Sequence, residues 1–219
     1  MKNTDRITEI AEKAHKDFEA RTLARDNALT KARELTRHAA NAIRAIHRAE
    51  NDLAHQHLTE GRAIVDELKS GLSPYPDLYY AGYTQDAIKE FCEATLTTCY
   101  IEGGIIPTPE DMGVTYSTYL RGLAETPGEL RRKCLDILRM GYSPEAERLL
   151  GEMDDIYSIL VTMDYPDAVT DGLRRQTDLL RGIVERTRAD LTLSLREDSL
   201  KTMLQQAIDT FSNNNEEGK

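Results

Sequence analysis

A row of acidic side chains stands out in residues 84–104. Asp86, Glu90 and Glu93 follow one another at spacings of four and three residues. If this segment is a helix, the spacing places three carboxylates along one side of it. Hard divalent cations such as Mg²⁺ bind through a few carboxylates and keep part of their water. The row therefore indicates a candidate cation site, although an acidic row on the outer face of a helix has the same spacing.

The residues from Arg21 to Arg48 carry the opposite charge. Seven basic and two acidic residues give this range a net charge of about +5, inside a chain whose formal net charge is −10. Four arginines fall within about 60° on a helical wheel, opposite an apolar stripe: Arg33, Arg37, Arg44 and Arg48. Because few acidic residues lie nearby to pair with them, these guanidinium groups suit the bidentate binding of phosphates. The stripe is a candidate nucleic-acid surface, with a solvated helix face as the alternative.

The composition is that of a charge-rich helical protein. The 219 residues are 40% hydrophobic and 30% charged, a length and balance sufficient for one large helical domain. No apolar run is long enough to cross a bilayer, and the first ten residues lack the apolar segment of a secretion signal. We therefore expect a cytoplasmic protein.

The cysteines and histidines show no metal-binding motif. Cys92 and Cys99 are seven residues apart in one predicted helix, too far to form a disulfide, and Cys134 stands alone. Zinc-finger spacing is absent among the histidines, which are His15, His38, His47, His55 and His57. We expect the cysteines to be buried and reduced. Phosphate-binding P-loop, nucleophile-elbow and zinc-protease motifs are also absent.

Helix-forming residues fill most of the chain. No Gly or Pro occurs before Gly61, which predicts an almost uninterrupted helical region to residue 69, as one helix or two. A segment rich in Gly, Pro, Ser and Tyr then precedes the acidic helix, which should end at Gly103. Later helices are expected to begin at 108–109 and 143–144, where a capping side chain precedes a proline.

The remaining elements complete an all-α prediction. Pro127 should kink or restart its helix. The last helical region runs from Pro166 to about Phe211, and residues 213–219 are expected to be a disordered tail. No segment alternates as a strand would. The sequence predicts a single-domain bundle of about six or seven helices over residues 1–212, with long N- and C-terminal helices.

Several segments, taken in order, resemble the translin and translin-associated factor X (Trax) superfamily. They are ARELTRHAANAIRAIHR, LYYAGY, KEFCEATL, YLRGLAETPGELRRKC and LLGEMDDIYSIL, followed by a long terminal helix. The similarity covers roughly residues 18–190. It implies the translin-like helical fold.

Within this superfamily, the Trax branch carries an E-x-x-E pair and a later aspartate as catalytic acids. The matching residues are Glu90, Glu93 and Asp155, so the chain resembles a Trax-type catalytic subunit. The neighbouring Asp154 matches a translin-like acid, which leaves two candidates for the aspartate. Glu129 lies in the family's G-E-L-x-R pattern and is either a further metal ligand or the partner of an arginine.

The resemblance implies an endoribonuclease that depends on Mg²⁺, with Mn²⁺ as a second candidate. The metal ligands would be Glu90, Glu93, Asp155 and Glu129. The substrate would be single-stranded or loosely paired RNA, and single-stranded DNA would be a further ligand. A translin-like protein that binds single-stranded RNA or DNA without cleaving it is the alternative.

The resemblance also implies an assembly. Members of the superfamily form octameric shells whose acidic and basic site residues face an inner cavity. We therefore expect a homo-octamer, with a mixed shell that contains a translin-like subunit as the alternative. An inward-facing basic surface would explain how an acidic chain binds an anion.

Overall fold

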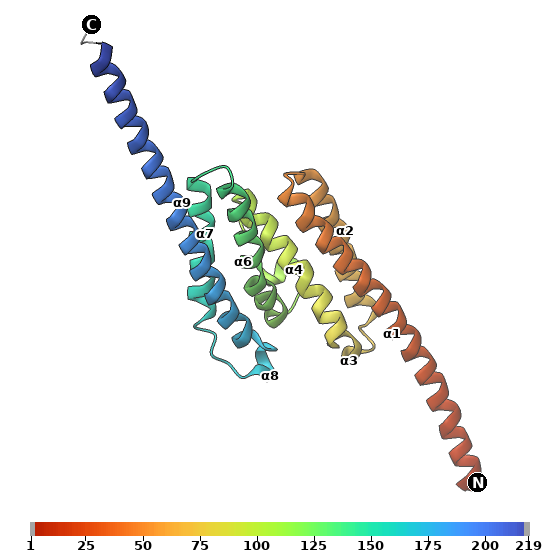
Figure 1. Ribbon diagram of the computed structural model, residues 1–219. Coiled ribbons are helices and arrows are strands. Elements are labelled where there is room, and N and C mark those ends of the chain that lie inside the picture. The colour runs from red at the N-terminus through yellow and green to blue at the C-terminus, as the bar shows by residue number, and fades with distance from the viewer. Residues whose placement is uncertain (1–2, 217–219) are drawn as a thin grey trace. The chain divides into compact units, whose positions relative to one another are not determined.

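The computed structural model describes residues 3–216, with side chains described for residues 3–213. The described residues form helices and no strands, which confirms the predicted all-α class (Figure 1). The helices are α1 (Asn3–His47), α2 (Asn51–Gly71), α3 (Pro76–Tyr79), α4 (Gly82–Glu102), α5 (Pro109–Met112), α6 (Tyr116–Leu138), α7 (Pro144–Leu160), α8 (Asp167–Thr170) and α9 (Leu173–Glu216). Within the described residues, no helix combines the length and apolarity needed to cross a membrane.

The chain divides into two compact units, which we describe separately. The first contains Met1–Thr98 and Ile106–Gly122, and the second contains Cys99–Ile105 and Leu123–Lys219. Helices α4 and α6 each contribute to both units.

In the first unit, α1 and α2 pack side by side (Figure 1). Part of their core is a cluster of Ala39, Ala42 and Ala94, with Ile43 and Leu58 packed against it. The small alanine side chains allow helix backbones to approach closely. Residues 3–27 of α1 contain no buried side chain, and this part of the helix extends past α2.

A tight turn separates α1 from α2. Ala49 has φ of 58°, in the left-handed region that only a few non-glycine residues adopt. Its amide donates to the Ile46 carbonyl, and the Arg48 amide donates to that of Ala45. The helical region to residue 69 is therefore two helices, even though no Gly or Pro marks the break.

Helix α6 begins in the first unit and approaches α4 very closely at Gly122. A Cβ atom on this glycine would lie 2.6 Å from the Cys92 Cβ, 2.9 Å from the Lys89 carbonyl oxygen and 3.0 Å from the Glu93 amide nitrogen. No side chain fits at these distances, so the contact requires glycine. It fixes the first turns of α6 against the part of α4 that carries the acidic residues.

Two predicted helix starts are confirmed. The Thr108 hydroxyl accepts a hydrogen bond from the Asp111 amide, and the Asp111 carboxylate accepts one from the Thr108 amide, which makes a capping box at the start of α5. The Ser143 hydroxyl accepts from the Glu145 amide at the start of α7. Pro127, by contrast, lies inside α6 and does not restart it.

In the second unit, α7 packs against α9 (Figure 1). Buried side chains of α7 are Ala146, Leu149, Leu150, Met153, Ile156 and Leu160. An ion pair of 2.8 Å joins Arg131 Nη2 of α6 to Asp190 Oδ2 of α9. Beyond Leu191 no described side chain of α9 is buried. The helix continues to Glu216, past residue 213 where the sequence places a tail, and residues 217–219 lie outside the described residues.

Candidate metal and nucleic-acid site

The structure brings Glu90 and Glu93 together on α4. A carboxylate oxygen of each lies within 4.8 Å of one from the other. Both side chains are partly exposed, so water and a cation can reach them. Two carboxylates at this separation can share one hard divalent cation.

Asp86, one helical turn earlier, does not join this pair. Its Oδ1 atom accepts a hydrogen bond of 2.7 Å from Arg121 Nη2 of α6. The Arg121 side chain is 12% exposed and the Asp86 side chain 59% exposed, so solvent screens this ion pair from the Asp86 side. The three-carboxylate row seen in the sequence therefore acts as a pair plus one residue that anchors α6.

A lysine lies directly beside the acidic pair. Lys89 Nζ is 3.1 Å from Glu90 Oε1, and the Lys89 side chain is 11% exposed. Its ammonium group offsets part of the repulsion between the neighbouring carboxylates. The pair is thus held together before any cation is added.

A surface pocket of about 310 Å³ lies next to Glu90. Helix α1 contributes Arg33, Leu29 and Ala32 to its wall, and α4 contributes Asp86 and Glu90. A basic group from α1 and acidic groups from α4 therefore line the same space. This pairing of charges suits a phosphate together with a divalent cation.

Three arginines of the α1 stripe are exposed, and within the part of the chain that the structure describes none of them has an ion pair shorter than 4.0 Å. Arg33 Nη2 lies 3.4 Å from the Thr30 hydroxyl, and Arg44 Nη2 donates to the Asn41 amide oxygen at 2.5 Å. Arg37 lies 4.0 Å from the Glu34 carboxylate, which is the outer limit of an ion pair. Their charge is therefore largely available to an external anion.

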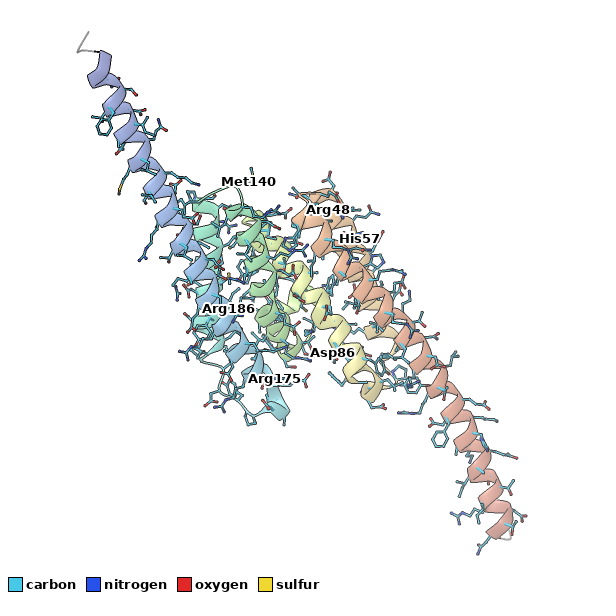
Figure 2. The ribbon with its side chains drawn as sticks, viewed as in Figure 1. Arg48, His57, Asp86, Met140, Arg175 and Arg186 are labelled. Carbon is cyan, nitrogen blue, oxygen red and sulfur yellow. The ribbon has the colours of Figure 1, made fainter. Side chains whose placement is uncertain are left out.

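Arg48 differs from the other three arginines. Its Nε and Nη2 atoms donate to the two oxygens of Glu50 at 3.0 and 2.6 Å, and it lies at the end of α1 (Figure 2). The prediction that the stripe is unpaired is therefore wrong for this residue. Glu50 lies only two positions further along the chain, outside the helix on which the wheel was drawn.

In the second unit, α7 presents the two candidate aspartates differently. Both oxygens of Asp154 lie 2.5 Å from Arg188 Nη2 of α9. Asp155 is exposed. Burial, followed by the charges of Glu152 and Asp155, raises the pKa of Tyr100 to about 12. Asp155 is thus within electrostatic range of the last turn of α4, whereas Asp154 is engaged with α9.

Two glutamates of α6 are held by neighbouring side chains. Arg132 Nη1 lies 3.5 Å from Glu129 Oε2, so the arginine pairing considered for Glu129 is present. Gln176 Nε2 donates to Glu125 Oε1 at 2.8 Å. Glu125 was not recognised from the sequence, although its spacing of four residues from Glu129 marks a second acidic row.

Two of the three cysteines are poorly suited to act as nucleophiles. Cys92 and Cys134 are buried. Burial raises the pKa of Cys92 to about 12 and that of Cys134 to about 11. Their thiolates are therefore scarce at neutral pH, and the prediction of buried thiols is confirmed for both residues.

Comparison with known proteins places these helices in a family. The chain is 32% identical over 182 residues to Uncharacterized protein MJ0175 of Methanocaldococcus jannaschii, covering 82% of this chain and 80% of that protein. The structure of AfC3PO with duplex RNA matches with a TM-score of 0.79 and 31% identity, covering 85% of this chain and 97% of the other. AfC3PO is an archaeal protein of translin/Trax type. This chain belongs to the translin/Trax superfamily.

Further comparisons agree with the translin/Trax assignment. A crystal structure of AfC3PO gives a TM-score of 0.79 at 32% identity. The crystal structure of apo-NeC3PO gives a TM-score of 0.71 at 20% identity, and the match covers 89% of this chain and 98% of the other. It shares the fold. No protein-family profile matches the sequence. Four of the five quoted motifs fall on α1, α4, α6 and α7, the helices that carry the candidate site residues, and LYYAGY spans the end of α3 and the start of α4.

Proposed function

We propose that this translin/Trax protein is a Mg²⁺-dependent endoribonuclease. The observation that carries the proposal is the Glu90–Glu93 pair, whose oxygens lie within 4.8 Å, beside a pocket that Arg33 also lines. Similarity to AfC3PO, whose structure is known with duplex RNA, supports RNA as the substrate class.

The donor set fits a hard cation. Carboxylate oxygens are the ligands that Mg²⁺ and Mn²⁺ prefer, and we assign Glu90, Glu93 and Asp155 to hold the ion. When bound, the ion would activate water and neutralise charge at the scissile phosphate. We assign Glu129 a smaller part, because its carboxylate lies 3.5 Å from an Arg132 guanidinium nitrogen. Glu125, four residues earlier, is the alternative acid on α6.

We assign the catalytic aspartate to Asp155 and not to Asp154. Arg188 holds both oxygens of Asp154, and removing that carboxylate from the arginine would cost a charge-assisted contact. Asp155 is exposed, and among the described residues no ion pair engages its carboxylate. It is therefore the better candidate of the two.

The α1 arginines would bind the RNA backbone. Arg33, Arg37 and Arg44 are exposed and have no ion pair shorter than 4.0 Å with a described acidic residue, whereas Glu50 already neutralises Arg48. We therefore expect the first three to contribute most to phosphate binding. The family resemblance implies single-stranded or loosely paired RNA, and the AfC3PO complex makes duplex RNA a second ligand to compare. Single-stranded DNA would bind through the same phosphate contacts.

We propose that the protein assembles as a homo-octamer, with a mixed shell containing a translin-like subunit as the alternative. Large apolar side chains are exposed in the parts of α1 and α9 without buried residues: Ile7, Ile10, Phe18, Leu23, Leu200, Met203, Leu204, Ile208 and Phe211. Neighbouring copies would cover them. Native mass spectrometry of the purified chain tests this: eight subunits are expected, and a monomer would contradict it.

The test of the nuclease proposal uses labelled RNA. Purified protein is incubated with single-stranded and duplex RNA of the same sequence in Mg²⁺, in Mn²⁺ and in excess chelator. We expect internal cleavage in either metal and none in chelator, with binding retained in chelator. Binding without cleavage under all conditions would instead favour the non-catalytic translin-like function, and cleavage in chelator would refute the metal assignment.

A further inference from the structure

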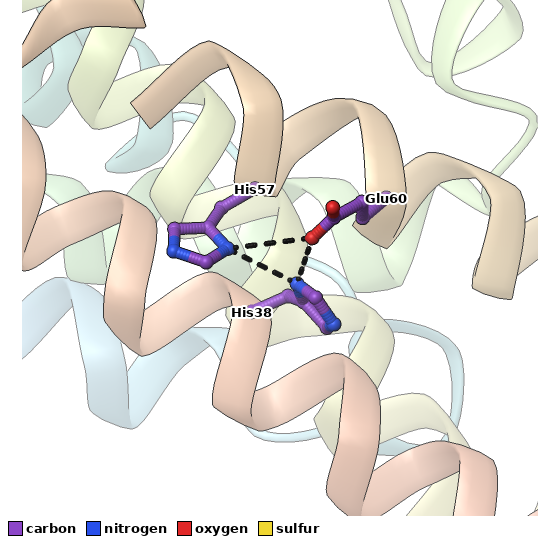
Figure 3. A group of neighbouring side chains, drawn as sticks. All are labelled: His38, His57 and Glu60. Atoms are coloured by element: carbon purple, nitrogen blue, oxygen red, sulfur yellow. Dashed lines mark hydrogen bonds and ion pairs between the residues drawn. The ribbon is translucent and has the colours of Figure 1, made fainter. Parts of the chain in front are cut away.

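A second group of ligand-type side chains lies between α1 and α2, within the first unit. It consists of His38 from α1 and of His57 and Glu60 from α2, whose side chains point toward one another (Figure 3). The His38 and His57 Nδ1 atoms lie 3.2 Å apart. Glu60 Oε2 is 2.9 Å from the first and 3.5 Å from the second. Three atoms that can bind a metal therefore form one small triangle.

Protons alone do not satisfy this triangle. If only His38 Nδ1 carries a proton, this N–H donates to Glu60 Oε2. The lone pair of His57 Nδ1 then has no free N–H to accept from, and it lies near the negatively charged Glu60 oxygen. If both Nδ1 atoms carry protons, both can donate to Glu60 Oε2, but the second of these contacts is long, at 3.5 Å, and the two N–H groups are crowded at an N–N distance of 3.2 Å. Either arrangement leaves at least one poor contact at a part-buried position, since His38 and His57 are 14% and 18% exposed. A cation bound by all three lone pairs removes the conflict.

The triangle has the dimensions of a tetrahedral site. Zn²⁺ lies about 2.0–2.1 Å from imidazole nitrogen and carboxylate oxygen, so adjacent ligands of a tetrahedron are about 3.3 Å apart. The three observed separations of 2.9, 3.2 and 3.5 Å bracket this value. The ligands thus match one face of a tetrahedron and leave one position for water or another ligand.

A neighbouring amide orients the Glu60 carboxylate. Gln56 Nε2 donates to Glu60 Oε1 at 3.1 Å, on the oxygen that does not face the histidines. This hydrogen bond, followed by smaller effects of His38 and His57, lowers the pKa of Glu60. An amide that fixes the outer oxygen of a ligating carboxylate is typical of the supporting shell of a metal site.

We propose that His38, His57 and Glu60 bind a zinc-class divalent ion that links α1 to α2. Two imidazoles and one carboxylate favour Zn²⁺, Co²⁺ and similar ions, whereas Mg²⁺ prefers all-oxygen sites. The ion joins residues 19 and 22 positions apart on adjacent helices, so its binding stabilises their pairing. The site uses none of the residues assigned to RNA cleavage, and either proposal can fail without the other.

The test measures Co²⁺ and Zn²⁺ binding to the full-length chain without a histidine tag. A Glu90→Gln/Glu93→Gln background excludes the acidic pair. We expect one Co²⁺ per chain with the intense visible absorption of tetrahedral cobalt, displacement by Zn²⁺ but not by Mg²⁺, and a Zn²⁺-dependent rise in melting temperature. The cobalt spectrum should lack a sulfur charge-transfer band, which excludes the cysteines.

Variants assign the ligands. His57→Ala and Glu60→Gln should each weaken binding by more than about 100-fold, and Gln56→Ala by about tenfold. His55→Ala is the matched control, because His55 is an exposed histidine on the same helix outside the triangle, and it should bind as the background does. Glu60→Gln keeps the size of the side chain, so weaker binding by this variant would not result from unfolding. No tetrahedral Co²⁺ site in the background protein, or equal binding after His57→Ala, would overturn the proposal.

Discussion

The first unit contains two groups of side chains whose atoms could serve as metal ligands, and the two groups differ in chemistry. On α4, Glu90 and Glu93 offer only oxygen atoms and lie beside a lysine, next to a pocket that includes an arginine. Between α1 and α2, the ligand atoms of two imidazoles and one carboxylate lie close enough together to bind one metal ion. The first group suits a hard ion that exchanges with solvent and substrate, and the second suits a tightly held borderline ion.

A cluster of ligand-type side chains does not by itself assign a function. Basic groups near the α4 pair would attract phosphate, so that pair is placed to act on a polyanion. The histidine cluster is tied into the packing of two helices, so that an ion there would act on stability. Donor type and neighbouring charge separate the two roles.

The largest expected effect is the loss of RNA cleavage when the acidic pair of α4 is changed. Glu93→Ala should lower RNA cleavage by at least about 100-fold, because a lost charge-stabilising group at a reacting phosphate typically costs that much. RNA affinity measured in chelator should change by less than about twofold. Glu102→Gln, at the end of the same helix, is the control and should cleave normally. Wild-type cleavage by Glu93→Ala would exclude the pair from the reaction.

Asp154 and Asp155 are adjacent on α7 but are expected to differ in role. Asp155→Asn should reduce cleavage nearly as strongly as Glu93→Ala, because its carboxylate is proposed to complete the ion's ligands. Asp154→Asn should leave cleavage within a few-fold of wild type and instead lower stability by about 1 kcal/mol through its arginine contact. Single-turnover cleavage and urea unfolding of both variants give the two readouts. Reversed phenotypes would move the catalytic assignment to Asp154.

An intermediate effect is expected where α6 meets α4. Gly122→Ala would force a Cβ against the backbone of Lys89 and Glu93, which should reduce the free energy of unfolding by about 1–3 kcal/mol. Urea unfolding followed by circular dichroism measures this. Gly128→Ala on the same helix is the control, because its Cβ would meet no atom within 4 Å. Equal stability of the two variants would contradict the close contact.

A smaller effect concerns the α1 arginines. Reversing the charge of Arg37 and Arg44 together should weaken RNA binding and reduce the slope of log affinity against log salt by up to about two. Arg48→Glu should change the slope less, because Glu50 already neutralises that arginine. Binding titrations over a series of salt concentrations test both. An unchanged slope in the double variant would make the stripe an ordinary solvated face.

The smallest effect concerns thiol reactivity. Burial raises the pKa of Cys92 to about 12 and that of Cys134 to about 11, so neither should be alkylated at pH 8 in the folded protein. Cys99 is only partly buried and should react first. Mass spectrometry after timed alkylation shows the order, and rapid labelling of Cys92 would contradict its burial.

Much of the fold could be predicted because its signals are local. Thr108 and Ser143 each precede a proline at a helix start, and their side chains cap α5 and α7 as that pattern requires. The sequence left open whether residues up to 69 form one helix or two, because Ala49 adopts φ of 58° without the glycine that usually marks such a turn.

The candidate site was predictable only within single helices. Glu90 and Glu93 lie together because a spacing of three residues places them on one face. The pairing of Asp86 with Arg121 joins residues 35 positions apart, and that of His38 with His57 joins residues 19 apart. Such contacts depend on which helices pack together, which helical spacing does not encode. The histidines were judged by zinc-finger spacing and therefore missed.

The most direct measurement counts the Mn²⁺ that the α4 pair binds and relates it to RNA cleavage. Free Mn²⁺ gives an electron paramagnetic resonance signal that protein-bound Mn²⁺ loses, so titration of wild type and of Glu90→Gln/Glu93→Gln gives the bound ion per chain. We expect the double variant to lose one bound Mn²⁺ and its cleavage activity together, while His57→Ala keeps both. A double variant that still binds this ion and cuts RNA would contradict it.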